Sequence, residues 1–331
     1  MKRWLWLAVG LAVAVLVPLW LGGGEMLGHL RGFPLWLLAV LFGMILVGWV
    51  VNTLRLRLLL DDEAQKVGRL KSLAVVMATE FAYSATPGGS GGPVTLIALL
   101  SRFGVRPARS SAAFAMDQFN DLLFFLLALG GILLYALFHN LSSNMEWLLV
   151  VSASLMAAGV LLCIAMVHYH RQMIKLNGRL LSRCGVSNAT RLRWARKLLH
   201  FLDAFADTLR LPRATLAKVF ALTCIHWGLR YSVLYLALQG LGADLQWAWT
   251  FLIQMIALST GQFSLLPGGA GAAELTSAAL LAPMVGKSTA GAAILIWRVV
   301  TYYFYLVAGG PIFFMMVGKP LLKKLMGWRQ T

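Results

Sequence analysis

Long apolar stretches separated by short polar segments dominate the 331-residue sequence. The runs Trp4–Leu21 and Leu35–Leu60 are each close to or above the ~20 residues that a helix needs to cross a bilayer. Further runs of spanning length cover 111–138, 147–167, 214–239 and 289–317. The pattern predicts an all-α polytopic membrane protein with about six full transmembrane helices.

Two other apolar stretches are interrupted by similar glycine-rich motifs 180 residues apart (267 − 87). Pro87–Gly91 reads Pro-Gly-Gly-Ser-Gly, and Pro267–Gly271 reads Pro-Gly-Gly-Ala-Gly. Non-helical backbone at membrane depth is tolerated only where it is buried in protein or lines a polar cavity. The arms around the first motif are too short for a hydrocarbon core of ~30 Å. We therefore expect two re-entrant helical hairpins, at 72–103 and 249–285, that turn near the membrane midplane.

The distribution of Lys and Arg predicts the topology. With both motifs in hairpins and the N-terminus in the cytoplasm, 25 of the 29 Lys and Arg residues lie on the cytoplasmic side, two lie outside, and two lie within spans. Positive charge accumulates on the cytoplasmic side of membrane proteins, so we expect both termini there, in the cytoplasmic (inner) membrane. The hairpins then enter from opposite sides and form an inverted repeat. The alternative is an eight-span count with both termini still in the cytoplasm.

The same pattern divides the chain, a single membrane domain over 1–331, into two halves joined by a basic connector. The expected segments are a first half at 1–169, the connector at 170–213, a second half at 214–317 and a basic tail at 318–331. The connector holds ten Lys and Arg residues against Asp203 and Asp207, with apolar residues at helical spacing. It predicts an amphipathic helix on an anionic leaflet, or alternatively a solvated linker helix packed on its own loops.

Composition narrows the class further. The chain is 60% hydrophobic and 12% charged, too little charge for a soluble protein of this length. The net charge of +17 is therefore assigned to anionic lipid and orientation rather than to nucleic acid. The three cysteines are widely spaced, so no disulfide framework, metal site or cofactor is expected. Lys2 and Arg3 before the first apolar run resemble a signal peptide, but Leu21-Gly-Gly-Gly-Glu is a poor cleavage site, so we favour a retained helix.

The glycine motifs are the first candidate site. Pro93 suits the first turn of a helix after the first motif, and a matching half-helix begins near Gly271. Helix N-termini carry unpaired N–H groups and partial positive charge, so they attract phosphate or carboxylate. The expected substrate contacts are Gly88, Gly89, Gly91, Gly268, Gly269 and Gly271. The alternative is that these glycines only permit tight helix packing.

Charged residues inside spans are the second candidate. Arg230 and Arg298 each lie roughly 13 Å deep, where an isolated cation costs at least ~2.5–3.5 kcal/mol. They are expected to bind an anionic headgroup, or alternatively to fix helix packing in a buried ion-pair network. The candidate acidic partners, which can also take up protons, are Glu80, Asp117, Asp121 and Glu274.

Three of these assignments have plainer alternatives. Asp117 and Asp121 share one helix face at i,i+4 spacing and form the one acidic pair that an enzyme might use. Glu274 lies in the first turn of its half-helix, where a carboxylate can bond free N–H groups. Arg55 and Arg57 are interpreted as interfacial anchors at a helix end.

The paired motifs resemble the membrane-domain family of lysylphosphatidylglycerol synthase. The resemblance rests on 85–91 (Ala-Thr-Pro-Gly-Gly-Ser-Gly), on 265–274 (Leu-Leu-Pro-Gly-Gly-Ala-Gly-Ala-Ala-Glu) and on the basic segment between the halves. It implies a flippase-type domain for an aminoacylated phospholipid. No soluble aminoacyl-transferase domain follows within the 331 residues, so the resemblance leaves the substrate open and does not imply lysyl transfer.

The expected function is transport of an anionic phospholipid or a polyprenyl-phosphate-linked lipid between leaflets through a midplane cavity. The alternatives are a membrane enzyme acting on a lipid-linked substrate and a non-transporting scaffold for lipid-modifying enzymes. The expected partners are the lipid substrate, membrane lipids at the basic face, a second copy of the chain in a homodimer, and a separate lipid-modifying enzyme.

Overall fold

The computed structural model describes residues 2–138 and 210–325, together with a few single positions between 150 and 208. Every regular element in these residues is a helix, which confirms the all-α prediction. The expected span at 147–167 and most of the basic connector at 170–213 lie outside the described residues.

The helices of the first half begin and end close to the predicted limits. Their bounds are α1 Lys2–Gly22, α2 Glu25–Gly32, α3 Leu35–Leu60, the 3₁₀ turn η1 Asp61–Lys66, α4 Arg69–Ala85, α5 Gly91–Arg102 and α6 Pro107–Phe138. The sequence did not predict α2, which bends away from α1 by 107°. Gly23 makes the turn with φ +57°, a conformation that glycine adopts without strain.

The second half has its own helix pair broken at a glycine motif, and its last span is irregular. Its elements are α9 Arg213–Gly240, α10 Trp247–Gln262, α11 Ala272–Val285, α12 Lys287–Arg298, the π-helix η2 Val299–Tyr303 and α13 Phe304–Leu325. The span expected as one regular helix over 289–317 therefore contains a π-helical turn. Such turns are rare and occur frequently at functional sites.

Lengths separate the spanning helices from the half-helices. Four helical segments among the described residues are long and apolar enough to cross a membrane: Leu35–Lys66, Pro107–Tyr135, Arg213–Gly240 and Lys287–Gly318. A fifth is added if the bent pair α1–α2 forms one span. By contrast, α5 has 12 residues and α11 has 14, roughly 18 and 21 Å of helix. The helices that follow the glycine motifs are thus short, whereas α4 and α10, which precede them, have 17 and 16 residues. The re-entrant hairpins and the total of six spans stay predictions.

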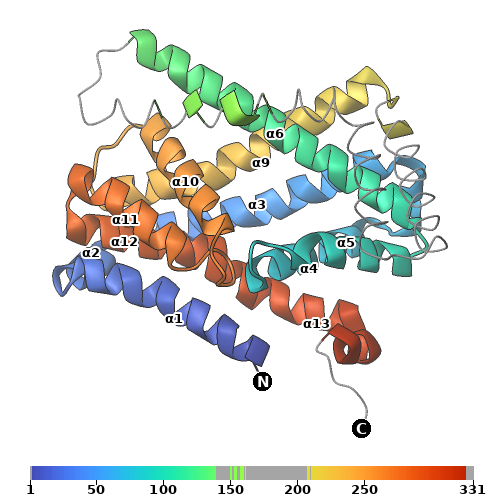
Figure 1. Cartoon of the computed structure of the whole chain (residues 1–331), viewed down its shortest axis with the longest axis horizontal. Coiled ribbons are helices and arrows are strands. Elements are labelled where there is room, and N and C mark those ends of the chain that lie inside the picture. The colour runs from blue at the N-terminus through green and yellow to red at the C-terminus, as the bar shows by residue number, and fades with distance from the viewer. Residues whose placement is uncertain are drawn as a thin grey trace, which may run out of the picture. The chain divides into compact units, whose positions relative to one another are not determined.

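The described residues divide into two compact units: residues 1–107 with 221–331, and residues 108–220. In the first unit, α1 packs on α11 and α12, and α4 packs on α13 (Figure 1). The crossing of α4 and α13 is close at Gly309, where an added Cβ would lie 2.8 Å from the Met77 carbonyl oxygen. Small residues at such crossings let helices pack tightly without a water-driven hydrophobic force.

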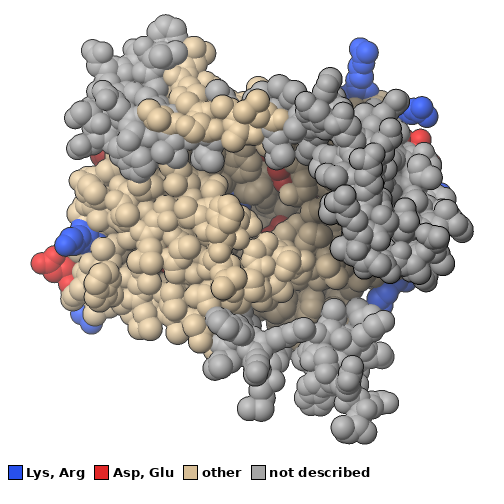
Figure 2. All heavy atoms as spheres, viewed as in Figure 1, with Lys and Arg blue, Asp and Glu red and all other residues tan. Residues whose placement is uncertain are grey.

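The described surface suits a lipid environment. On the face shown in Figure 2, uncharged side chains make up most of the described surface, and the visible charged side chains lie mainly near its edges. Large apolar side chains such as Trp20, Leu35 and Val307 are 72–81% exposed. A soluble protein rarely exposes so much apolar surface, whereas a bilayer requires it.

Candidate functional site

A threonine stabilises the first glycine motif. The Thr86 hydroxyl donates to the Ala82 carbonyl (2.7 Å) and accepts from the Gly91 N–H (2.8 Å). Gly88 and Gly89 have φ of +55° and +68° and so turn the chain where a side chain would be strained. The N–H of Gly92 donates to the Gly89 carbonyl, and Pro93, in the first turn of α5 as predicted, has none. The first turn of α5 is therefore largely satisfied from within the loop.

A serine plays the corresponding part in the second motif. The Ser264 hydroxyl donates to the Ala270 carbonyl (3.0 Å) and accepts from the Leu266 N–H (3.1 Å). Gly268, Gly269 and Gly271 have φ between +64° and +81°. Helix α11 begins directly after Gly271, as the sequence predicted, and no side chain caps it.

The two motifs meet, although 180 residues separate them. Pro87 and Pro267 form an isolated antiparallel β-bridge, so the loops after α4 and α10 lie side by side (Figure 1). An added Cβ on Gly88 would lie 3.4 Å from the Gln262 carbonyl oxygen. The structure thus brings both sets of predicted glycines to one place within the first unit.

Arg298 and Glu274 form the charged part of this place. Arg298 Nε lies 2.7 Å from Glu274 Oε1, and the two side chains are 3% and 0% exposed. Arg298 Nη1 also donates to the Gly268 carbonyl (3.3 Å). The close Nε–Oε1 approach does not have hydrogen-bond geometry, and both carboxylate oxygens and Arg298 Nη2 have no hydrogen-bond partner among the described residues. The alternative role of Glu274 as a partner for helix N–H groups is therefore not observed.

Aromatic side chains from the π-helical turn support the second motif. The Tyr302 hydroxyl donates to the Pro267 carbonyl (3.2 Å), and an added Cβ on Gly268 would lie 2.1 Å from the Tyr302 ring. The Arg298 guanidinium lies 5.5 Å from the centre of that ring and 5.0 Å from the Trp297 ring, within cation–π range. Helical periodicity in the sequence gives no sign that Tyr302 touches the loop.

Helix α1 is also part of this place. The Tyr303 hydroxyl donates to the Leu11 carbonyl, and Ala14 packs with Ala270 and Tyr302 in a buried cluster. An added Cβ on Gly10 would lie 3.3 Å from the Pro267 ring. Helix α1 therefore contributes to the surroundings of the second motif, while its retention in the mature protein stays a prediction.

The contacts of Arg230 are with aromatic side chains rather than with the glycine motifs. Its Nη1 donates to the Tyr305 hydroxyl (2.9 Å), and its guanidinium lies over the Tyr305 and Trp227 rings at 5.1 and 5.9 Å. Glu80 is close enough to interact with it electrostatically. The pairing of Arg230 with a substrate at the glycine motifs stays a prediction.

A polar network that the sequence analysis missed surrounds Glu80. Asn52 Nδ2 donates to Glu80 Oε1 (3.3 Å) and lies 3.5 Å from His226 Nε2, while Asn52 Oδ1 accepts from Arg55 Nη1 (3.0 Å). Arg55 is 2% exposed, so its interpretation as an interfacial anchor is wrong. Arg57, by contrast, bonds the Ala64 carbonyl and the Ser72 hydroxyl at the helix end. The i,i+3 spacing of Asn52 and Arg55 on an apolar helix was the available signal.

Asp117 and Asp121 lie one turn apart on α6, in the second unit. They share a helix face as the spacing predicts. Their coupling to the arginines of the first unit stays a prediction.

These features define a class: an α-helical integral membrane protein with two helix pairs broken at glycine loops and a buried ion pair where the loops meet. The chain belongs to a family whose model is described as the lysylphosphatidylglycerol synthase transmembrane region and matches residues 7–309. It is also similar to a UPF0104 membrane protein of Archaeoglobus fulgidus, with 23% identity over 81% of this chain and 83% of that protein. The family resemblance read from the two motifs is confirmed.

Proposed function

We propose that this protein transports an anionic phospholipid or a polyprenyl-phosphate-linked lipid between membrane leaflets. One observation carries the proposal: a buried Arg298–Glu274 pair lies where the two glycine loops meet. A transporter's substrate site typically lies at such a junction of broken helices. The family description concerns the membrane region of a lipid synthase, which supports a lipid substrate.

The ion pair allows Arg298 to bind either Glu274 or a substrate phosphate. With no substrate bound, the Glu274 carboxylate balances the Arg298 guanidinium, so the pair can stay buried. The unpartnered Nη2 of Arg298 gives a phosphate a donor that Glu274 does not already use. Guanidinium groups bind phosphate through pairs of parallel hydrogen bonds, so a headgroup competes directly with Glu274.

The two loops contribute unequally to this site. Thr86 and the loop itself already satisfy the first turn of α5, while the charged groups lie beside Gly268 and α11. We therefore assign the headgroup mainly to the second loop. The first loop closes the site from the opposite side, and Arg230, Glu80, Asp117 and Asp121 are proposed as secondary charges.

Reconstitution into liposomes with labelled lipids tests the proposal. We expect leaflet exchange of an anionic lipid in the wild type, loss of exchange in Arg298→Gln/Glu274→Gln, and normal exchange in Arg210→Gln, whose side chain is 82% exposed. No exchange together with turnover of a lipid-linked substrate would favour the enzyme. No activity of either kind would favour the scaffold.

Orientation and assembly belong to the same proposal. We place the protein in the inner membrane with both termini and the basic connector in the cytoplasm, where anionic lipids attract Lys and Arg. A homodimer and a separate lipid-modifying enzyme are the proposed protein partners.

A further inference from the structure

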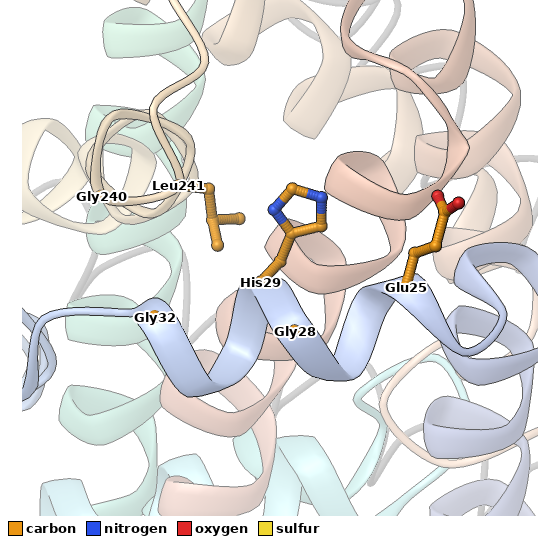
Figure 3. Close-up of a pocket in the computed structure, with 6 residues that line it drawn as sticks. All are labelled: Glu25, Gly28, His29, Gly32, Gly240 and Leu241. Carbon is orange, nitrogen blue, oxygen red and sulfur yellow. The ribbon is translucent and has the colours of Figure 1, made fainter.

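A polar pocket lies away from the glycine loops, between α2 and the C-terminal end of α9. Its lining residues are Glu25, Gly28, His29, Gly32, Gly240 and Leu241, and its volume is about 320 Å³. Glu25 and His29 rise from the same side of α2, as their i,i+4 spacing requires (Figure 3). The pocket is open, and nothing in the proposed transport path accounts for it.

The electrostatic character of this pocket is negative. Glu25 is the one acidic side chain among its lining residues. Two helices end at the pocket, α2 at Gly32 and α9 at Gly240. Helix C-termini carry partial negative charge and stabilise cations. Arg31 lies among the lining residues of α2 in sequence, and Lys287 precedes Ser288, which contacts His29, but neither arginine nor lysine lines the pocket.

The donors favour an organic cation over a metal ion. A metal site generally needs several carboxylate, imidazole or thiolate ligands, and no group of three such residues occurs in the described parts of the chain. The volume lies in the range of small-molecule sites and far exceeds one ion. Leu241 and the backbone of three glycines offer apolar contact to methylene groups.

The imidazole of His29 is held in place from outside the pocket. Its Nε2 lies 3.5 Å from the Ser288 hydroxyl on α12. This contact links the ring to α12. Glu25 therefore supplies the carboxylate of the pocket, and the negative ends of α2 and α9 lie beside it.

We propose that this pocket binds a primary ammonium group carried on a short alkyl chain. Glu25 accepts hydrogen bonds from the ammonium, the C-terminal ends of α2 and α9 stabilise its charge, and Leu241 packs on the attached carbons. The ammonium belongs either to a lipid headgroup or to a soluble amine. Binding here does not depend on transport through the glycine loops, so either proposal can fail without the other.

Glycine geometry provides a matched pair of variants. An added Cβ at Gly28 meets no atom within 4 Å, so Gly28→Leu places an apolar side chain at the pocket without a clash at its Cβ. Gly24 is equally open but does not line the pocket, so Gly24→Leu is the control. Glu25→Gln removes the charge at nearly constant shape on an exposed helix.

The test uses the full-length protein in nanodiscs made only of phosphatidylglycerol, which contains no amine. Ethanolamine and short-chain phosphatidylethanolamine are titrated separately and followed by calorimetry, with Mg²⁺ and Zn²⁺ as further probes. We expect saturable binding of an amine, at least about tenfold weaker in Glu25→Gln and Gly28→Leu and unchanged in Gly24→Leu.

The two amine probes separate the possible sources of the ammonium. Tight binding of ethanolamine alone supports a soluble amine, and binding of the phosphatidylethanolamine alone supports a lipid headgroup. Thermal unfolding checks that each variant is folded. Absence of saturable amine binding, amine binding equal in all folded variants, or binding of a metal ion without an amine would overturn the proposal.

Discussion

Arg298 and Glu274 lie 2.7 Å apart between Nε and Oε1, at the last residue of α12 and in the first turn of α11. Neither side chain is more than 3% exposed. Two charges this deeply buried stabilise a fold only as a pair, because each alone has lost its hydration. Because Arg298 also bonds the Gly268 carbonyl, variants of this pair test the second glycine loop as well.

Removing one member of this pair should destabilise the protein more than removing both. We expect each single variant, Arg298→Gln or Glu274→Gln, to be less stable than the wild type. The lone Glu274 carboxylate that Arg298→Gln leaves should cost about 3–5 kcal/mol. The double variant should recover most of that loss, because two neutral amides remain. Thermal unfolding of the purified protein measures both effects.

Transport separates the function of the pair from its contribution to stability. The double variant should be folded yet inactive in the liposome assay, because no guanidinium remains at the second loop. An active double variant would show that the pair serves packing alone, as the ion-pair alternative holds.

The sequence predicted Glu274 and Arg298 as site residues, but not that they pair with each other. Hydropathy identified Arg298 as a cation inside a span, and the glycine motif identified Glu274 as a first-turn residue. Four acidic residues were candidate partners for two arginines, and periodicity cannot rank them. The choice depends on how α11 packs against α12, which is a long-range property of the fold.

The bridge between Pro87 and Pro267 makes a cross-link possible. Opposed residues in an antiparallel pair have Cα atoms about 4.5–5.5 Å apart, within the range that a disulfide spans. In a background without Cys163, Cys184 and Cys224, Pro87→Cys/Pro267→Cys should form a disulfide on mild oxidation. We expect the cross-link to stop transport and its reduction to restore transport.

Single-cysteine variants control for oxidation damage in that experiment. Gel mobility after limited proteolysis reports the cross-link itself. If the pair stays reduced under conditions that oxidise an exposed dithiol, the loops are not adjacent in the membrane.

Gly268 should tolerate no side chain. Its φ is +64°, and an added Cβ would lie 2.1 Å from the Tyr302 ring. We expect Gly268→Ala to cost at least ~1–2 kcal/mol from backbone strain alone and to abolish transport. Gly131→Ala on α6 is the matched control, because an added Cβ there meets no atom within 4 Å and the helix gains ~0.5–1 kcal/mol. Expression and thermal stability should therefore move in opposite directions in the two variants.

Tyr305 offers a way to separate the packing role of Arg230 from a charge role. Tyr305→Phe removes the 2.9 Å hydrogen bond to Arg230 Nη1 but keeps the ring beneath the guanidinium. We expect a loss of about 1–2 kcal/mol in stability with transport retained. Arg230→Gln should instead abolish transport. Equal transport in both variants would remove Arg230 from the proposed path.

The elements that sequence reasoning missed share one cause. The π-helical turn that brings Tyr302 to Pro267, and the network joining Asn52 to Glu80 and His226, arise from packing between helices far apart in the sequence. Helical periodicity gives the face on which each residue lies, but not the register between helices. Helix ends were predicted well because glycine, proline and charge mark them locally.

Orientation in the membrane is the last prediction, and it can be tested at single positions. The positive-inside pattern places Asp62 in the cytoplasm and Asp244 outside. Helix α3, with 26 residues or roughly 39 Å, is long enough to put Glu25 and Asp62 on opposite sides. In a background without native cysteines, a membrane-impermeant maleimide added to intact cells should label Asp244→Cys and Glu25→Cys, and should reach Asp62→Cys only after the membrane is opened.

The loops make the test stricter, because opposed hairpins place residue 90 on a hairpin entered from the cytoplasm and residue 270 on one entered from outside. Labelling of Ser90→Cys only from outside, or of Ala270→Cys only from the cytoplasm, would contradict that arrangement and favour the eight-span alternative.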